Sequence, residues 1–299
     1  MRKKRVFLAI ITIFVLLIVL FTIINGLGLY EKSSVIGENI GVVEITGVIK
    51  DSKEELRQIY DFGKDNKIKA VIIRIDSPGG AVGPSQEIYN EILKVKSKKP
   101  VIASIGTMGA SGGYYIASSA TKIVANPGSI TGSIGVIMQF MNFENLLGKV
   151  GIKGDVIKSG AFKDTGSPFR EMTKEEKELM QSVINDVHNQ FIDAVCQGRK
   201  LKREEVEKIA DGRIITGKMA KELKLIDELG NFNDAVDLAK KMAGIKGDVK
   251  LVYGRKKRSA LMELLGEFTE SGSKSQLFLF LTNIKLPNYL TPIFKNLEN

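Results

Sequence analysis

The longest apolar run of the chain lies close to the N-terminus, where residues 6–25 include no charged side chain. As an α-helix this run would be about 30 Å long, the thickness of the hydrocarbon core of a bilayer. Basic residues 2–5 precede it, and the first acid after it is Glu31. The positive-inside rule therefore predicts one transmembrane helix in the cell membrane, with residues 1–5 in the cytoplasm and the remainder extracytoplasmic. A cleaved signal peptide is the alternative; it is disfavoured because the run exceeds a usual h-region and no A-x-A site follows.

After a linker at 26–39, short apolar runs of strand length alternate with amphipathic segments of helix length. The run 69–77 is typical of a strand buried on both faces of a parallel sheet, and Pro78 with the two following glycines is expected to end it. The predicted strands are 40–49, 69–77, 101–105, 122–125, 155–158 and 249–253, and the predicted helices are 51–66 with Asp51 or Ser52 as its cap, 85–96, a short one from Ser111, 174–198 with Thr173 before it, 217–223 and 231–243. This alternation predicts an α/β domain over residues 40–245, followed by a C-terminal tail, 246–299.

The net charge of +10 changes this picture little. Four of the 44 basic residues precede the apolar run, and the remaining excess over 34 acidic residues is spread along the chain. Nucleic-acid binding usually involves a clustered basic stripe, so it is not predicted. The one tight basic cluster, 255–258, is interpreted as a solvated loop, with contact to an anionic membrane surface as the alternative. The single cysteine, Cys196, excludes an intramolecular disulfide, and the sequence has no Cys/His cluster that could bind zinc.

Ser111 is the candidate nucleophile. It lies in the sequence G-A-S-G-G, residues 109–113, which follows a predicted buried strand and opens a predicted helix. This position would place the hydroxyl beside free backbone N–H groups, and the sequence also matches the G-x-S-x-G pattern of α/β-hydrolases. Because the pattern is short, a glycine-lined helix cap without chemistry is the alternative.

The base that would activate this serine is either a histidine or a lysine. His188, the single histidine, borders the apolar face of the predicted helix 174–198 and is interpreted as a structural or surface residue. A lysine can serve if its amine is neutral, which burial with few nearby acids favours. Lys163 follows a predicted buried strand and is flanked by small and apolar residues, with a solvated lysine as the alternative. Asp164 beside it would hold the charge on the amine unless its side chain points away.

Five ordered segments together resemble the signal peptide peptidase A family, in its short, single-copy form, among the Clp/crotonase-like serine peptidases. The segments are R-I-D-S-P-G-G at 74–80, G-A-S-G-G-Y-Y at 109–115, A-N-P-G-S-I-T-G-S-I-G-V at 125–136, K-S-G-A-F-K-D at 158–164 and G-R-I-I-T-G-K-M-A at 212–220. Several motifs in this order are far more specific than any one of them. The resemblance implies an α/β fold built as the repeated β-β-α superhelix of Clp and crotonase proteins.

The resemblance also implies roles for individual residues. Ser111 would be the nucleophile and Lys163 the general base of a Ser/Lys dyad. Ser133 would hydrogen-bond the lysine and orient it. The oxyanion hole would be formed by backbone N–H groups, those of Gly79 or Gly80 and of Gly112. Members of this family need no metal and no nucleotide, so no cofactor is expected.

Substrates and partners follow from the same resemblance. Family members degrade remnant signal peptides and other hydrophobic peptides at the membrane, and they assemble into homo-oligomeric rings around a shared cavity. The expected partners in a bacterial cell are therefore these peptides, the lipid bilayer and further copies of the chain, because one catalytic-domain copy would need neighbours to complete a shared site. The tail is expected to dock on a neighbour or in an active-site groove. A crotonase-like acyl-CoA enzyme and an inactive membrane-tethered scaffold are the alternatives.

Overall fold

A computed structural model describes residues 39–254 of the chain. The predicted transmembrane helix, 6–25, the rest of the N-terminal segment to residue 38, and the tail from residue 255, including the basic cluster 255–258, lie outside the described residues. Within residues 39–254, no helix combines the length and the apolar character that a membrane crossing requires.

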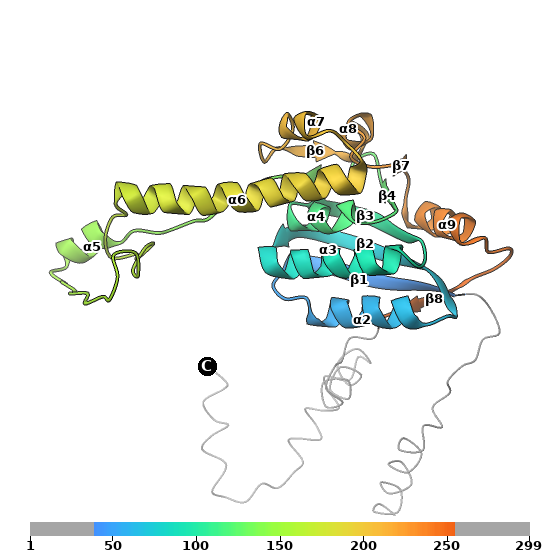
Figure 1. The fold of residues 1–299 in the computed structure, drawn as a ribbon, viewed down its shortest axis with the longest axis horizontal. Helices are drawn as coiled ribbons and strands as arrows, with labels where there is room; N and C mark the ends of the chain where they lie inside the picture. Colours follow the sequence, from blue (N-terminus) through green and yellow to red (C-terminus); the bar gives the residue numbers. More distant parts are fainter. Residues whose placement is uncertain (1–38, 255–299) are drawn as a thin grey trace, which may run out of the picture. The chain divides into compact units, whose positions relative to one another are not determined.

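A mostly parallel sheet forms the centre of the described part (Figure 1). Its strands are β1 (Asn39–Ile49), β2 (Ile68–Gly80), β3 (Val101–Ala110), β4 (Lys122–Ala125), β5 (Ile130–Gly132), β6 (Ile214–Thr216), β7 (Glu228–Leu229) and β8 (Lys250–Tyr253). Their order is β6-β5-β3-β2-β1-β8, with β4 pairing with β3 and β7, and only the pairing of β5 with β6 is antiparallel. Because parallel strands have their carboxyl ends at one edge, Gly80 and Ala110 end their strands on the same side of the sheet.

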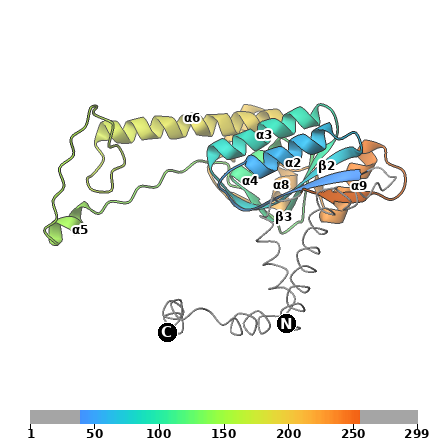
Figure 2. The same cartoon turned by 90° about the horizontal axis from the view of Figure 1, so that it is seen from below.

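Helices cover both faces of this sheet. They are α2 (Lys53–Lys64), α3 (Val82–Lys96), α4 (Gly112–Ser118), α5 (Glu144–Lys149), α6 (Lys174–Arg199), α7 (Arg203–Glu207), α8 (Gly217–Glu222) and α9 (Phe232–Ala243). Alternate residues of a strand face opposite sides, so Val43 and Ile73 join a core with α2, α3, α4 and α6, whereas Val42 and Ile72 pack against α9. Figure 2 shows α9 across the sheet from α2 and α3. The strands are therefore buried on both faces, as their apolar runs predicted.

The structure confirms most predicted elements and corrects three details. Pro78 and Gly79 do not end β2, which continues to Gly80 beside β1, and β3 likewise runs through its glycine-rich end to Ala110. Ser52 precedes α2 but its hydroxyl donates to Glu87 instead of capping the helix. The predicted strand 155–158 is wrong, because this segment is exposed and no neighbouring strand pairs with it. The short elements β5, β6, β7, α5 and α7 were not predicted.

Residues 137–172, which include α5, form an arm that projects from the body of the protein, as both cartoon views show (Figures 1 and 2). Apolar side chains in this arm are exposed, among them Ile137, which is 88% exposed, and Ile157, which is fully exposed. The arm joins α6 at Thr173, which caps this helix in a reciprocal capping box with Glu176, as the sequence predicted for the start of the helix.

Candidate active site

Ser111 lies in a strained turn between β3 and α4. Its backbone has φ 52° and ψ −122°, a conformation that L-residues rarely adopt, and it precedes the first residue of α4. Two backbone hydrogen bonds fix the turn: the N–H of Ser111 donates to the carbonyl of Gly132 over 2.9 Å, and the N–H of Tyr115 donates to the carbonyl of Ser111 over 2.8 Å. Such strain costs about 1–3 kcal/mol and persists only where the surroundings impose it, as at a strand-to-helix nucleophile turn.

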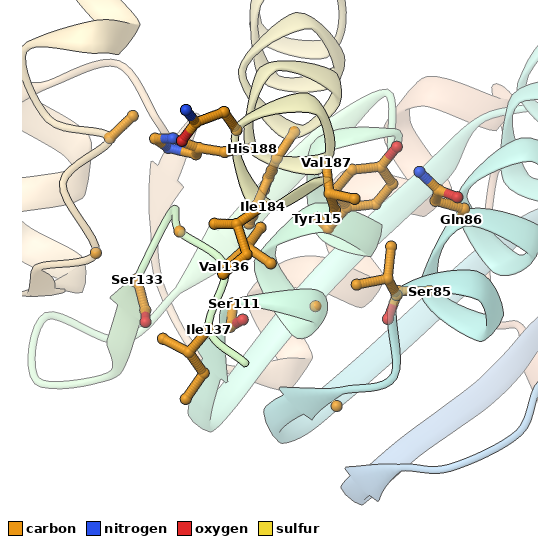
Figure 3. Close-up of a pocket in the computed structure, with 18 of the residues that line it drawn as sticks. Ser85, Gln86, Ser111, Tyr115, Ser133, Val136, Ile137, Ile184, Val187 and His188 are labelled. Atoms are coloured by element: carbon orange, nitrogen blue, oxygen red, sulfur yellow. The ribbon is translucent and has the colours of Figure 1, made fainter. Parts of the chain in front are cut away.

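A pocket of about 530 Å³ opens beside this serine (Figure 3). Its lining combines small residues around Ser111 with an apolar wall. The wall consists of Val82 from α3, Tyr115 from α4, Val136 just before the arm, Ile137 at its start, and Ile184, Val187 and Phe191 from α6. A pocket of this size and composition accommodates an apolar side chain or a short apolar peptide segment.

The two glycines at the end of β2 approach the Ser111 turn closely. At Gly79, where φ is +97°, a Cβ would lie 2.6 Å from the nitrogen of Gly112 and 2.9 Å from the Cβ of Ser111. The N–H of Gly79 donates to the hydroxyl of Ser77 over 3.0 Å, and that hydroxyl donates to the carbonyl of Gly47 over 2.6 Å. Because Gly79 has already used its N–H, Gly80 is the better donor for a ligand in the pocket.

Gly80 and Gly112 both line the pocket. A Cβ at Gly112 would lie 3.3 Å from the nitrogen of Gly80 and 2.6 Å from the hydroxyl oxygen of Ser85, so no larger residue fits without displacement. The two backbone nitrogens therefore lie on the same side of the pocket as Ser111. This arrangement suits two donors to one oxyanion.

Ser133 lies next to Ser111 across the paired strands β3 and β5. Ala110 is paired with Gly132, so the two serines follow paired residues, and both line the pocket (Figure 3). Ser133 also has positive φ, 51°, and its N–H donates to the carbonyl of Arg213 over 2.8 Å. Two serines with strained backbones at one pocket indicate a site whose geometry is imposed by the fold.

His188 lines this pocket as well, from α6. The ring is half-buried at the border of the apolar face, and its Nε2 is buried without a hydrogen-bond partner among the described residues. The prediction of a structural or surface histidine therefore missed its place at the pocket. A serine triad also requires a carboxylate that orients the imidazole through Nδ1, and within residues 39–254 no hydrogen bond joins the side chain of His188 to a carboxylate.

Lys163 is not among the residues that line the pocket. It lies in the arm, in a series of turns in which its N–H donates to the carbonyl of Gly160 over 3.1 Å, and its side chain is exposed. One chain thus brings Ser111, Ser133, Gly80 and Gly112 together, and it does not bring Lys163 to them. The sequence placed Lys163 after a buried strand, and the exposed segment before it overturns that placement.

The carboxylate of Asp164 is engaged by two other cations. Lys158 donates to its Oδ1 over 2.6 Å, and Arg170 donates to both of its oxygens, from Nη2 over 2.7 Å and from Nε over 2.8 Å. These hydrogen bonds, from Arg170 first and from Lys158 second, hold the pKa of Asp164 far below its usual range. The side chain therefore faces Lys158 and Arg170, as the lysine hypothesis required.

The pocket wall was not identified from the sequence. Ile184, Val187 and Phe191 were visible as part of the apolar face of the helix 174–198, and an apolar face ordinarily packs against the core. In the structure Phe191 packs against Tyr115, with the rings tilted by 60° and their centroids 5.0 Å apart, and it lines the pocket together with Val187 and Ile184, which lie one and two turns before it. The sequence offered one indication of this wall, the length of the predicted helix 174–198. A helix that extends beyond the core it packs on leaves part of its apolar face uncovered.

Comparisons with known proteins agree with this geometry. The model of peptidase family S49 matches residues 93–246, and the model of the Clp protease family matches residues 39–130. A Synechocystis protein whose name marks it as a candidate protease is 44% identical over 212 residues, which cover 71% of this chain and 76% of the relative. An Enterococcus faecium protein named as a candidate signal peptide peptidase A is 35% identical over 213 residues, covering 67% of this chain and 62% of the relative.

A solved structure supports the fold. The membrane-bound, stomatin-specific protease 1510-N, in a mutant form, superposes with a TM-score of 0.51 over 75% of this chain and 100% of that chain, at 19% sequence identity. At this identity the likeness shows the mixed α/β, Clp-protease-like fold alone. Together with the family model and the relatives, it leads to one assignment: the chain belongs to peptidase family S49 and is a serine peptidase of the signal peptide peptidase A family.

Proposed function

We propose that this protein is a membrane-anchored endopeptidase with a Ser111/Lys163 dyad, in which the lysine that serves each pocket belongs to a neighbouring copy of the chain. The observation that carries the proposal is the separation of the two groups: Ser111 lies in the pocket, whereas Lys163 is exposed on the arm and outside it. The exposed apolar side chains of the arm, such as Ile137 and Ile157, support burial against another protein surface.

The chemistry follows from the site. A neutral Lys163 amine takes the proton of Ser111 as the Ser111 Oγ forms a bond to the peptide carbonyl carbon. The carbonyl oxygen becomes an oxyanion, which accepts hydrogen bonds from the N–H groups of Gly80 and Gly112. The ammonium then returns the proton to the leaving nitrogen as the C–N bond breaks. Water, deprotonated by the same amine, hydrolyses the acyl-enzyme ester and restores Ser111.

Two features of the pocket suit this reaction. Each oxyanion donor of this kind contributes about 3–4 kcal/mol of transition-state stabilisation, and the two glycine N–H groups lie on the Ser111 side of the pocket. Ser133 has a hydroxyl beside Ser111, where it can accept from the incoming lysine and orient it. No cofactor is needed for any of these steps.

The proposed substrates are remnant signal peptides and other hydrophobic peptides at the extracytoplasmic membrane face. The apolar wall formed by Tyr115, Val136 and residues of α6 supports this substrate class. The uncharged run 6–25 supports a single-pass anchor that would keep the site near such peptides. Head-to-tail contacts, arm to pocket, generate a closed ring when the rotation between copies closes, which is the assembly proposed here.

The proposal is tested by complementation between inactive variants. Ser111→Ala and Lys163→Ala are each expected to abolish hydrolysis of a fluorogenic hydrophobic peptide while the fold and assembly persist. Co-expressed in equal amounts, the two variants should form mixed assemblies in which about a quarter of the sites combine an intact serine with an intact lysine from the neighbour. Activity should therefore return to about a quarter of that of the unmodified protein.

Other outcomes separate the alternatives. If mixed assemblies stay inactive, the two groups act within one chain or not at all. If Lys163→Ala alone keeps near-full activity, the lysine is not the base, and His188 in the pocket wall becomes the candidate. If Ser111→Ala leaves the rate of hydrolysis unchanged, the pocket is not the peptidase site. If the unmodified protein itself hydrolyses no peptide, the scaffold alternative is favoured.

A further inference from the structure

We propose that Arg170 is a positioning residue for the reaction: it holds the carboxylate of Asp164 away from Lys163 and ties the loop that carries this lysine to the start of α6. This inference rests on the proposed function, because it concerns the state in which Lys163 reaches a pocket. It adds to the dyad a residue that touches neither the substrate nor Ser111.

The guanidinium of Arg170 joins two carboxylates. On one side it donates from Nη2 and Nε to the two oxygens of Asp164, over 2.7 and 2.8 Å. On the other side Nη1 donates to Oε2 of Glu176 over 2.8 Å, and Nη2 also contacts Oε1 of Glu176. Bidentate contacts of this kind fix both the distance and the orientation of a carboxylate relative to the guanidinium. A lysine, which presents a single ammonium group, cannot do this.

Glu176 holds Arg170 at the start of α6. Its side chain is only 2% exposed, and it accepts from the backbone N–H of Thr173 over 2.9 Å in the capping box and from the hydroxyl of Thr165 over 3.2 Å. Hydrogen bonds from Arg170, Thr173 and Thr165 lower the pKa of Glu176 to about 2. The carboxylate is therefore ionised at any pH at which the enzyme works, and the loop stays tied to the helix.

The electrostatic consequence concerns Lys163. A general base must be neutral, and a free carboxylate within a few ångströms would raise the pKa of the amine and keep it charged. Asp164 follows Lys163 directly in the chain, yet its charge is paired with Arg170 and Lys158, which are the charged groups that face it among the described residues. Glu176, on the far side of Arg170, is satisfied by the same guanidinium. The pairing keeps the acid that adjoins Lys163 in the chain from stabilising the protonated amine.

Removing Arg170 should therefore change how activity depends on pH. In Arg170→Gln, Asp164 keeps only Lys158 and becomes available to Lys163, so its charge can stabilise the protonated amine and the low-pH limb of the kcat/KM profile moves to higher pH. A shift of this limb by one pH unit lowers kcat/KM about tenfold at pH values below the limb and leaves the high-pH plateau in place. In the double variant Arg170→Gln/Asp164→Asn, the limb should return to its original position.

The experiment measures kcat/KM against pH for the full-length, assembled protein and these variants. Arg203→Gln is the matched control, because Arg203 also bridges two carboxylates, those of Asp193 and Glu207, at an exposed position at the body end of α6. In the Arg203→Gln variant, the low-pH limb of the kcat/KM profile should not move. Assembly and thermal unfolding are compared in parallel, and if Arg170→Gln does not assemble, Arg170→Lys should show the same shift with a smaller size.

The results separate this inference from the proposed function. An unmoved limb in Arg170→Gln, an equal loss at every pH, or a limb that Asp164→Asn does not restore would overturn the positioning role. A single Asp164→Asn variant whose limb moves to higher pH would overturn it too. If Lys163→Ala is inactive in the same assay, the dyad stands whatever happens to Arg170; if Lys163→Ala is active, the proposed function itself fails.

Discussion

The body of the protein and the arm contain similar apolar residues in opposite surroundings. Ile72 in β2 is fully buried between the sheet and α9, whereas Ile157 in the arm is fully exposed. In the body, burial on both faces holds the Ser111 turn in a conformation that the residue would not adopt alone. In the arm, a set of ion pairs around Arg170, close to the start of α6, holds the loop that carries Lys163. Ser111 is thus held by packing and the loop that carries Lys163 by charge, and the two kinds of support should fail under different changes.

The largest expected effect comes from Gly79→Ala. Its Cβ would meet the nitrogen of Gly112 at 2.6 Å at a backbone φ of +97°, so the turn that presents Ser111 and the oxyanion donors must shift. We expect kcat/KM to fall by about two orders of magnitude and the free energy of unfolding by about 2 kcal/mol.

Gly83→Ala is the control for this change, since nothing lies within 4 Å of a Cβ there. It falls in the first turn of α3, where alanine is favourable, so activity should be unchanged and stability equal or slightly higher. Peptide hydrolysis and denaturant unfolding measure both. A Gly79→Ala variant as active as Gly83→Ala would contradict the close approach of β2 to the Ser111 turn.

The second effect concerns the arm and should leave the body intact. Ile157→Lys places a charge on a fully exposed side chain, so the stability of an isolated chain should change by less than about 0.5 kcal/mol. If this side chain is buried against a neighbouring copy, assembly should weaken, and activity at a fixed protein concentration should fall about tenfold.

The matched control is Met242→Lys, at an exposed apolar side chain of α9 on the body. Its assembly and activity should be unchanged. Sedimentation and peptidase assays across a dilution series distinguish the two variants. Equal behaviour of the two would mean that the exposed apolar residues of the arm are not a contact surface.

The smallest effect tests the strain at Ser111 directly. Ser111→Gly and Ser111→Ala both remove the hydroxyl, but only glycine adopts φ 52° without cost, so the glycine variant should be more stable by about 1 kcal/mol. At Ser97, whose φ of −68° is ordinary, the order should reverse. Denaturant unfolding of the four variants gives the comparison, and an alanine variant at position 111 that matches glycine would argue against strain.

The sequence predicted the body well and the arm poorly, for a physical reason. In the body, apolar runs such as 69–77 and 122–125 coincide with buried strands, because an apolar side chain in a compact domain is usually buried by its own chain. Val156 and Ile157 gave the same signal, and they are exposed instead. The pattern of residues does not say whether an apolar side chain is to be covered by its own chain or by another molecule, so the strand at 155–158 and the placement of Lys163 after it were wrong.

In the candidate site, too, some features could be predicted from the sequence and others could not. Ser111 and its glycines could be predicted because a tight turn restricts the residue types at each position. The choice between Gly79 and Gly80 depended on the hydrogen bond from Gly79 to Ser77, which no local pattern reveals. The pocket wall on α6 depended on where a long helix leaves the core. The pairing of Asp164 with Arg170, six residues away, could be suspected from charge but not distinguished from the other acids and bases nearby.

The position of Lys163 has a consequence for the cell that makes this peptidase. A newly folded chain has Ser111, the proposed nucleophile, in place but does not carry the proposed base to its own pocket, so a lone copy would be harmless to the proteins around it. Hydrolysis per chain would then rise with the local density of copies and vanish on dilution. Under the proposed arrangement, the enzyme would be active only where its copies have gathered.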